Sequence, residues 1–170
     1  NFPQMSISGF LYMHDLENLF TLNVLPAPEF ETSGPPGHLY ISHDLVNTQQ
    51  ATVIGNAVLG VGHNVGATSF ELLAGRGDLS TLILDKPPHD SLSNLVDFEL
   101  STSPAAARLE LGGIAFDQAA YTRAGSTGSL QLMNHGRPVY QLTNVSVFGG
   151  SFTTGFDPHT GYDYVLYSSG

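Results

Sequence analysis

Histidine and aspartate are the residues whose types and spacing first suggest chemistry. The chain has seven histidines, and three of them precede an aspartate directly, at His14–Asp15, His43–Asp44 and His89–Asp90. Neighbouring residues of a strand point to opposite faces, which is poor geometry for a catalytic pair. In a turn, an aspartate more readily caps backbone amides. We therefore expect these pairs to stabilise turns, and we expect His43, on the apolar face of an alternating segment, to be a hydrogen-bonded core histidine.

Metal-ligand spacing gives no local motif. Neither H-x-H nor H-E-x-x-H occurs, so only His and Asp residues distant in sequence could build a zinc site. Calcium suits an acidic protein, but no D-x-D-x-D loop is present. Asp157 and Asp163 flank one turn and could share an ion, although solvated turn carboxylates are the favoured interpretation. The sequence thus predicts no cofactor and leaves the metal ligands unassigned.

Motifs of nucleophilic and phosphate chemistry are missing. There is no G-x-S-x-G elbow, no Gly-Asp-Ser start and no dinucleotide or phosphate fingerprint. A glycosidase needs two facing carboxylates, and 15 acidic residues offer many pairs that the sequence cannot place. We expect a protein without catalytic function, with an enzyme whose site is assembled from distant residues as an alternative.

Two short segments are candidate recognition sites. Tyr162, Asp163 and Tyr164 combine aromatic rings with a carboxylate, which suits stacking on a sugar and hydrogen bonding to its hydroxyls. Arg76, Gly77 and Asp78 form an integrin-type tripeptide in an expected tight turn between two strands. We predict the first group as a ligand-binding site and the second as a receptor-recognition site.

Composition restricts partners and habitat. The 170 residues include 15 acidic and only 5 basic side chains, for a net charge of -10, and no cysteine. The basic residues are scattered and Lys86 is the sole lysine, so nucleic acid and anionic membranes are unsuitable partners. No apolar run is long enough for a transmembrane helix. Scarce lysine, acidic charge and a start at Asn1 rather than Met indicate a processed protein that is secreted or displayed at the cell surface.

Short apolar or alternating segments, separated by turn residues, predict strands throughout. The expected strands cover 5–13, 19–25, 38–45, 51–61, 68–74, 79–84, 95–100, 108–116, 129–133 and 138–148, with a bend near Gly55 and Pro-rich breaks at 26–37 and 86–93. Because no helix is long enough to connect parallel strands, the prediction is a single all-β domain over 1–170. Its fold is expected to be an antiparallel sandwich or barrel of about ten to twelve strands.

Helix signals are confined to two short segments. Asp90–Val96 has an N-cap and helical spacing of apolar residues, and Ala105–Ala107 could add one turn. At most one short helix is therefore expected. The segment 8–15 is similar to 150–157, since both place aromatic residues before an aspartate, which indicates a faint internal repeat.

The segment Gly149–Tyr164 (GGSFTTGFDPHTGYDY) predicts a hairpin around Asp157-Pro158-His159-Thr160-Gly161. It resembles the C-terminal hairpin of bacterial exported β proteins that carry a PEP-CTERM sorting tail, which implies an exported surface or matrix protein. The segment Leu84-Asp85-Lys86, with Ser91 and the later Tyr140–Val145, is similar to tail-tube-type secretion ring proteins. That second resemblance implies a component of a secretion tube.

These observations favour an exported, non-enzymatic β protein that acts by surface contacts, as a matrix, filament or adhesion subunit. Low charge density permits pairing between strand edges, so self-association is expected. The alternatives are a module that binds carbohydrate or a small ligand, a tail-tube-like secretion component, and an enzyme. If the chain is the ligand-binding module, its expected partner is a glycan or a small ligand.

Overall fold

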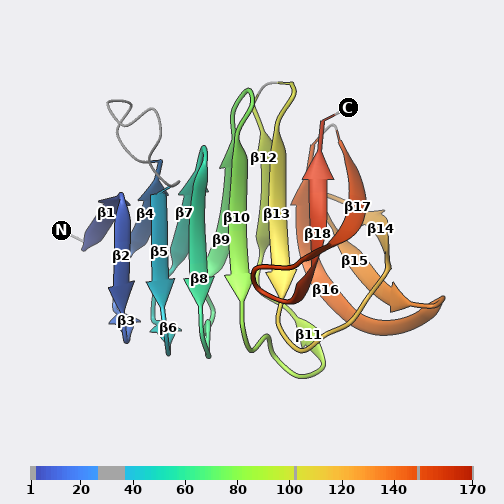
Figure 1. Ribbon diagram of the computed structural model, residues 1–170, viewed down its shortest axis with the longest axis horizontal. Helices are drawn as coiled ribbons and strands as arrows, with labels where there is room; N and C mark the ends of the chain where they lie inside the picture. Colours follow the sequence, from blue (N-terminus) through green and yellow to red (C-terminus); the bar gives the residue numbers. More distant parts are fainter. Residues whose placement is uncertain (1–2, 27–36, 102, 149, 170) are drawn as a thin grey trace.

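The computed structural model describes residues 3–26, 37–101, 103–148 and 150–169. Within these ranges the chain forms 18 strands and no helix, so the all-β prediction is confirmed. Two large sheets face each other as in a sandwich (Figure 1), and the described strands do not close into a barrel. Most of the predicted Pro-rich break at 26–37 lies outside the described residues.

The strands belong to three sheets. Sheet A contains, in spatial order, β1 (Gln4–Ser8), β4 (Thr21–Leu25), β7 (Gln50–Ile54), β9 (Ser69–Ala74), β12 (Val96–Leu100), β16 (Arg137–Val147), β15 (Thr127–Asn134) and β14 (Gln118–Ala124), with β11 (Ser91–Leu92) also pairing with β16. Sheet B contains β17 (Ser151–Asp157), β18 (Tyr162–Ser168), β13 (Ala106–Leu111), β10 (Leu79–Leu84), β8 (Ala57–Val61), β5 (Gly37–Ile41) and β2 (Phe10–Met13). The small sheet C pairs β3 (Leu16–Glu17) with β6 (Leu45–Val46).

Up to the end of β13 the chain winds as a parallel β-solenoid. It passes from sheet A to sheet B and back, and each strand pairs in parallel with the strand one coil earlier, as β5 does with β2 and β8 does with β5. The expectation of antiparallel sheets is therefore wrong for this part of the chain. The argument from missing helices failed because each crossover runs through the opposite sheet.

Sharp corners account for part of the difference between the 18 strands observed and the ten to twelve expected. The expected strand 5–13 is divided at Gly9, and the expected strand 51–61 is divided at Gly55. These glycines have φ values of +91° and +65°, which residues with a Cβ rarely adopt. The bend predicted near Gly55 is thus confirmed, as a corner that passes the chain from sheet A to sheet B.

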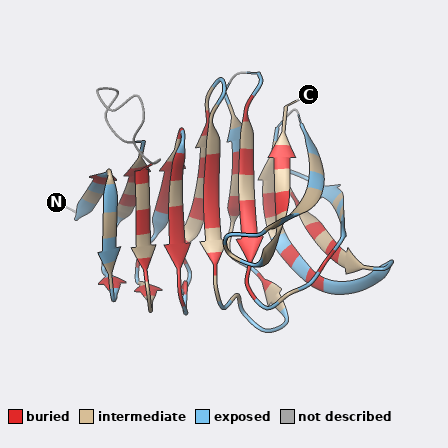
Figure 2. Cartoon of the chain, viewed as in Figure 1, coloured by how far each residue is buried: buried red, intermediate tan, exposed pale blue. Residues whose placement is uncertain are grey.

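The core lies between the two sheets, where alternate side chains from both meet. Figure 2 shows buried bands running across neighbouring strands at matching heights. Parallel register places equivalent residues above one another, as with Leu39 on Leu59 and Ile41 on Val61, all four of which are fully buried. Burial of such apolar side chains contributes about 1.5–3 kcal/mol each. The solenoid is therefore held together by stacks of like residues.

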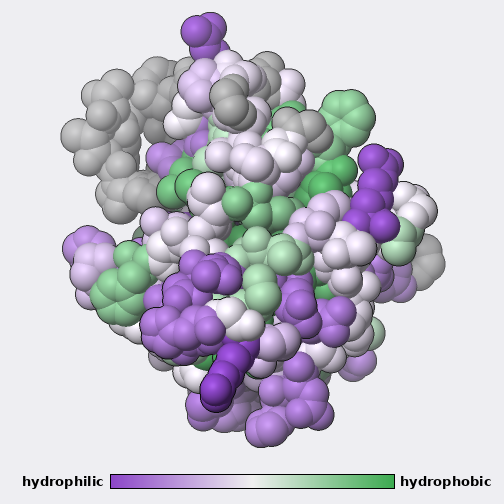
Figure 3. Space-filling model, turned by 90° about the vertical axis from the view of Figure 1, so that its right-hand side faces the viewer, coloured by the Kyte–Doolittle hydropathy of each residue, from purple (hydrophilic) through white to green (hydrophobic). Residues whose placement is uncertain are grey.

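Antiparallel hairpins finish the molecule at the other end. β15 and β16 turn at His135 and Gly136, which both have positive φ, and β17 and β18 turn over Asp157 and Gly161. The Asp157 carboxylate accepts a 2.8 Å hydrogen bond from the His159 amide, and the hairpin predicted around Asp157–Gly161 is confirmed. On this end of the molecule, hydrophobic patches are separated by polar surface (Figure 3).

Two smaller expectations are wrong. The proposed helix 90–96 contains the short strand β11 and the start of β12, because Leu92 and Val96 are fully buried in sheet packing. Ala106 and Ala107 begin β13. The segments 8–15 and 150–157 are not structural repeats either, since the first contains a strand of the parallel solenoid and the second a strand of the C-terminal hairpin.

Candidate functional site

The repeat that the structure reveals is His-Asp-Leu-x-Asn, found at 14–18 and again at 43–47. Each copy occupies the corner that leads from sheet B into sheet C. Leu16 and Leu45 are buried and pair in register, while the histidines ahead of them face outward. A third, degenerate copy follows at His63-Asn64-Val65, and Val65 is also buried. The solenoid therefore stacks three equivalent corners above one another.

This stacking produces a histidine ladder, which we define as His14, His43 and His63. The rings of His14 and His43 are 5.0 Å apart with an interplanar angle of 18°, and those of His43 and His63 are 4.6 Å apart at 28°. All three side chains are partly or largely open to solvent. The expectation that His43 is a core histidine is therefore wrong. β5 ends at Ile41, so the alternation does not extend to His43.

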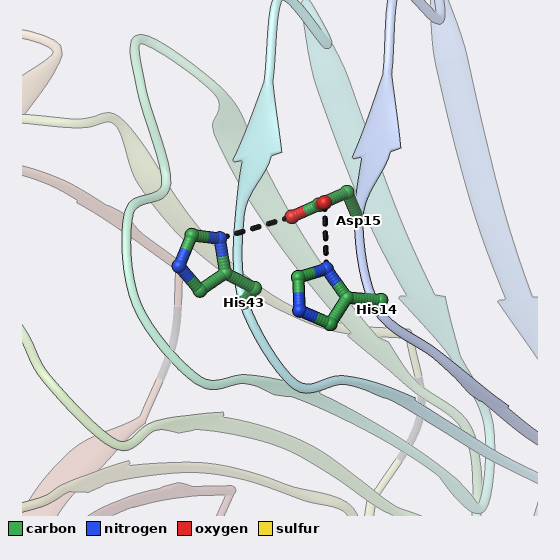
Figure 4. A group of neighbouring side chains, drawn as sticks. All are labelled: His14, Asp15 and His43. Atoms are coloured by element: carbon green, nitrogen blue, oxygen red, sulfur yellow. Dashed lines mark hydrogen bonds and ion pairs between the residues drawn. The ribbon is translucent and has the colours of Figure 1, made fainter.

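Two carboxylates accompany the ladder. Asp15 bridges the Nδ1 atoms of the first two rings (Figure 4), with its Oδ2 2.7 Å from Nδ1 of His14 and its Oδ1 3.1 Å from Nδ1 of His43. The amide of Asp44 also donates to Asp15 Oδ1 at 3.1 Å. The hydrogen bond with His14 lowers the pKa of Asp15 below its ordinary value, and the amide of Asp44 lowers it further. Asp15 therefore contacts His43 and Asp44 of the next coil as well as His14 of its own coil.

The charges around His63, at one end of the ladder, differ from those around His14 at the other end. Nζ of Lys86 lies 2.9 Å from Nε2 of His63, and the Asp44 carboxylate accepts a 3.0 Å hydrogen bond from the Asn64 amide. A positive charge therefore stands beside His63, whereas no lysine or arginine is shown in contact with His14 or His43 among the described residues. Asp15 and Asp44 do accept backbone amides, but these amides belong to the next coil, so the expectation that each aspartate caps its own turn is wrong at both positions. The sequence did not predict the histidine ladder, because its three histidines come from different coils and no local spacing links them.

A second cluster is the aromatic face, which we define as Phe10, Tyr12, His38, Tyr40 and Tyr162 on the outer surface of sheet B. Register pairs Phe10 with His38 and Tyr12 with Tyr40. The rings of Tyr12 and Tyr40 stack at 5.5 Å, and those of Phe10 and His38 meet edge to face at 5.4 Å. Phe10 is 69% exposed and Tyr12 60%. Four of these rings therefore lie side by side on the neighbouring strands β2 and β5, and Tyr162 comes from β18.

Asp85 links this surface to the C-terminal hairpin. The Tyr40 hydroxyl donates a hydrogen bond to Asp85 Oδ2, and this bond raises the pKa of Tyr40 to about 12. Burial raises the pKa of Tyr162, and the charge of Asp85 and its hydrogen bond raise it further. One carboxylate is therefore shared by tyrosines from β5 and β18, which lie far apart in sequence.

The predicted ligand-binding group divides between two faces. Tyr162 and Tyr164 lie on the outer side of β18, where Tyr164 carries the Arg108 guanidinium 5.2 Å from its ring centroid. Asp163 points the other way, and its Oδ2 accepts a 2.9 Å hydrogen bond from the Phe116 amide. The structure thus brings Tyr162 to Asp85 rather than to Asp163. Asp157 contacts Arg108 at 3.5 Å, so the ion-sharing role considered for Asp157 and Asp163 has no geometric support.

A buried ion pair lies beneath the β17–β18 turn. Glu110 is fully buried, with Nε of Arg108 3.1 Å away in an ion pair that lacks hydrogen-bond alignment. The Thr160 hydroxyl donates to the other Glu110 oxygen at 2.8 Å. Burial raises the pKa of Glu110 above its ordinary value. The turn thereby excludes water from part of sheet B next to the aromatic face.

The predicted receptor-recognition tripeptide forms the turn between β9 and β10, as expected. Arg76 and Gly77 are exposed, whereas Asp78 is half-buried and its carboxylate accepts a 3.1 Å hydrogen bond from the Gly75 amide. The Gly77 amide donates to the Pro104 carbonyl at 2.6 Å. Asp78 therefore stabilises its own turn, and recognition through Arg76, Gly77 and Asp78 stays a prediction.

An acidic cluster lies on the outer face of sheet A. The carboxylates of Glu71, Asp97 and Glu99 lie close together, and burial raises the pKa of both Asp97 and Glu99. Glu71 accepts hydrogen bonds from Thr52 at 2.9 Å and from Gln50 at 3.0 Å. Its charge is thus partly satisfied within the sheet, and the three acidic residues form a structural network.

No protein-family model matches the chain, and no curated protein or solved structure does so either. Among the described residues, no helix offers a membrane-spanning apolar segment. The resemblances to PEP-CTERM-type exported proteins and to tail-tube proteins therefore stay predictions.

Proposed function

We propose that this chain is a non-enzymatic contact module of an exported protein, and that it adheres to carbohydrate through the aromatic face of sheet B. This joins the expected adhesion role with the expected glycan partner. The observation that carries the proposal is the stacked Tyr12–Tyr40 pair, in which Tyr12 is exposed and Tyr40 is partly exposed and hydrogen-bonded to Asp85.

The orientation of Tyr40 supports this function. A Cβ built on Gly60 would lie 2.5 Å from Cδ2 of Tyr40, so the ring extends across the neighbouring strand instead of standing clear of it. Flat aromatic surfaces suit the apolar faces of sugar rings, since both are broad and weakly hydrated. Because successive coils repeat the position, Tyr12 extends the same surface toward the edge strand β2.

Polar groups at the border of this surface support it as well. Asp85 offers acceptor oxygens, and the hydroxyls of Tyr12, Tyr40 and Tyr162 can each donate or accept. Sugar hydroxyls need both kinds of partner. Moreover, neither lysine nor arginine belongs to the aromatic face, so the surface suits neutral glycans better than anionic ones.

Affinity electrophoresis of the full chain through gels containing soluble neutral polysaccharides, such as xylan, laminarin or a soluble cellulose derivative, tests the proposal. At least one of them should retard the protein, and Tyr12→Ala should abolish the retardation because the exposed half of the stacked pair is removed. Phe148→Ala is the matched control, since Phe148 is 84% exposed and outside the aromatic face.

The folded state of each variant is checked by circular dichroism. Equal retardation of Tyr12→Ala and the parent would show that the aromatic face is not the binding surface. If neither neutral nor anionic polysaccharides retard the protein, the proposal that a glycan is its partner is wrong.

A second candidate is self-association into a matrix or filament, and one observation favours it. Within the described ranges, β1 pairs only with β4 and β2 only with β5, so both have an edge that can accept another strand. Light scattering and electron microscopy at low and high salt distinguish this function. A protein that stays monomeric at high concentration in both conditions would exclude it, while glycan retardation would be unaffected.

A further inference from the structure

We propose that His14, Asp15 and His43 bind one divalent transition metal ion of the Zn²⁺ class. The ligand atoms are Nδ1 of each histidine and Oδ2 of Asp15. They come from two successive coils of the solenoid, so no spacing within either segment could have indicated them. The site is separate from the aromatic face and does not depend on the proposed function.

The ligand types select the metal. Two imidazole nitrogens with one carboxylate oxygen are a combination that zinc and its neighbours prefer, whereas calcium takes oxygen ligands almost exclusively. Three protein ligands leave a fourth position for water in a tetrahedral site. The net charge of -10 adds a general attraction for cations.

The three side chains already lie close together. Nδ1 of His14 is 2.7 Å from Asp15 Oδ2, Nδ1 of His43 is 3.1 Å from Asp15 Oδ1, and one potential ligand atom from each residue falls within 4.8 Å of the others. In a tetrahedral zinc site, ligand atoms are separated by about 3.3 Å, given metal–ligand distances of about 2.0–2.2 Å. The 2.7 Å pair must therefore widen by about 0.6 Å to admit the ion. The stacked rings of His14 and His43 must also rotate so that their in-plane lone pairs converge on it, and both side chains are exposed to solvent. Asp15 Oδ1 can keep its hydrogen bond from the Asp44 amide, which holds the carboxylate in place.

Binding of the metal ion requires a proton to move within each imidazole ring. A neutral imidazole that donates from Nδ1 to Asp15 carries its lone pair on Nε2, and a tautomer shift moves that proton to Nε2 and frees Nδ1 for the metal. Both histidines have exposed side chains, so water can carry the proton between the two nitrogens. The Asp15 carboxylate needs no proton shift, because an aspartate side chain is ionised at neutral pH.

The neighbouring group of His43, Asp44 and His63 is the weaker candidate. Lys86 stands 2.9 Å from His63 Nε2, and its charge opposes a cation at that end of the ladder. Nδ1 of His43 is also 3.5 Å from Asp44, farther than from Asp15. The two groups share His43, so we expect one ion per chain.

Isothermal titration of the untagged full chain with Zn²⁺ tests the proposal. We expect one saturable site, a loss of affinity of about tenfold or more in His43→Gln or Asp15→Asn, and no saturable binding of Ca²⁺ at the same concentrations. His89→Gln is the matched control, because His89 also contacts its neighbouring aspartate, at 2.8 Å, but its side chain is 98% exposed and outside the ladder.

A second measurement guards against variants that do not fold. Nuclear magnetic resonance of the parent protein should show imidazole shifts of His14 and His43 on addition of Zn²⁺, while His135, which contacts Asp117 elsewhere, keeps its shifts. The proposal is overturned by an absence of saturable zinc binding, or by equal losses of affinity in His89→Gln and His43→Gln. Shifts of His135 with none at His14 would overturn it too.

Discussion

Tyr40 lies across Gly60, its partner in register on the next strand, so closely that the glycine has no room for a side chain. The same relationship recurs at the C-terminal hairpin, where Tyr164 covers its partner Gly155. In both pairs the glycine is what allows a tyrosine to lie along the sheet. Sheet B therefore accommodates tyrosine rings that lie over the neighbouring strand.

Gly60→Ala should displace Tyr40. The added Cβ meets ring atoms at 2.5 and 3.1 Å, and such overpacking costs about 1–3 kcal/mol. Urea denaturation should show this loss in the parent background but little of it in a Tyr40→Ala background, where nothing lies above the glycine. Equal losses in both backgrounds would mean that the cost comes from the backbone.

Replacing Asp85 by Asn should lower the pKa of Tyr40 from about 12, because the amide carries no charge and is a weaker acceptor. Ultraviolet titration of tyrosinate measures this change. Tyr140, whose burial raises its pKa to about 12, is an internal reference that Asp85→Asn should leave in place. A Tyr40 titration that does not move would contradict the hydrogen bond between Tyr40 and Asp85.

The raised pKa values of Tyr40 and Tyr140 also predict how the free energy of unfolding changes at alkaline pH. The folded pKa values of Tyr40 and Tyr140 are higher than those of the unfolded chain, so the folded state holds its protons longer. Their contribution to stability is fully present below about pH 10 and is lost as pH rises toward about 12. Urea midpoints measured across this window should fall, and the fall should be smaller in Asp85→Asn.

Arg108→Met should destabilise the protein by about 3 kcal/mol, because it leaves the carboxylate of buried Glu110 without its cation. Pairing the change with Glu110→Gln should recover much of this loss. Burial already raises the pKa of Glu110 and loss of Arg108 raises it further, so the cost of Arg108→Met should shrink as pH falls from 7 toward 5. Denaturation at both pH values measures the effect, and a pH-independent cost would contradict it.

Asn47 has a φ of +54° and donates a 3.1 Å side-chain hydrogen bond to Asn18, which has a φ of +61°. Asn47→Ala and Asn47→Gly both remove this bond, but only alanine is strained by the left-handed backbone. We expect the glycine variant to be more stable by about 1 kcal/mol in thermal denaturation. The reverse order would show that the corner relaxes away from positive φ.

Local chemistry predicted much of the C-terminal part. The turns at His135–Gly136 and Asp157–Gly161 follow from residues that favour positive φ and from an aspartate that accepts backbone amides. The all-β class follows in the same way from short segments bounded by glycine and proline. These features depend on contacts within a few residues, which a single sequence displays directly.

The solenoid and its ladder depend on contacts between coils, which no local pattern displays. The copies of His-Asp-Leu-x-Asn lie 29 residues apart, and the degenerate copy at His63 follows after 20, so no fixed period draws attention to them. Comparing 14–18 directly with 43–47 would have found the repeat. Even so, the approach of Asp15 to His43 depends on parallel register, which the missing helices seemed to exclude.

The parallel register also determines how such a chain can change in length. Each coil of the solenoid rests on the coil before it and supports the one after it, and stability in such arrays is a sum of nearest-neighbour terms. A whole coil can therefore be duplicated or removed between 37 and 68 without altering the hairpins that close the far end. The number of rungs, and with it the length of the histidine ladder, is a quantity that evolution or a protein engineer can adjust in unit steps.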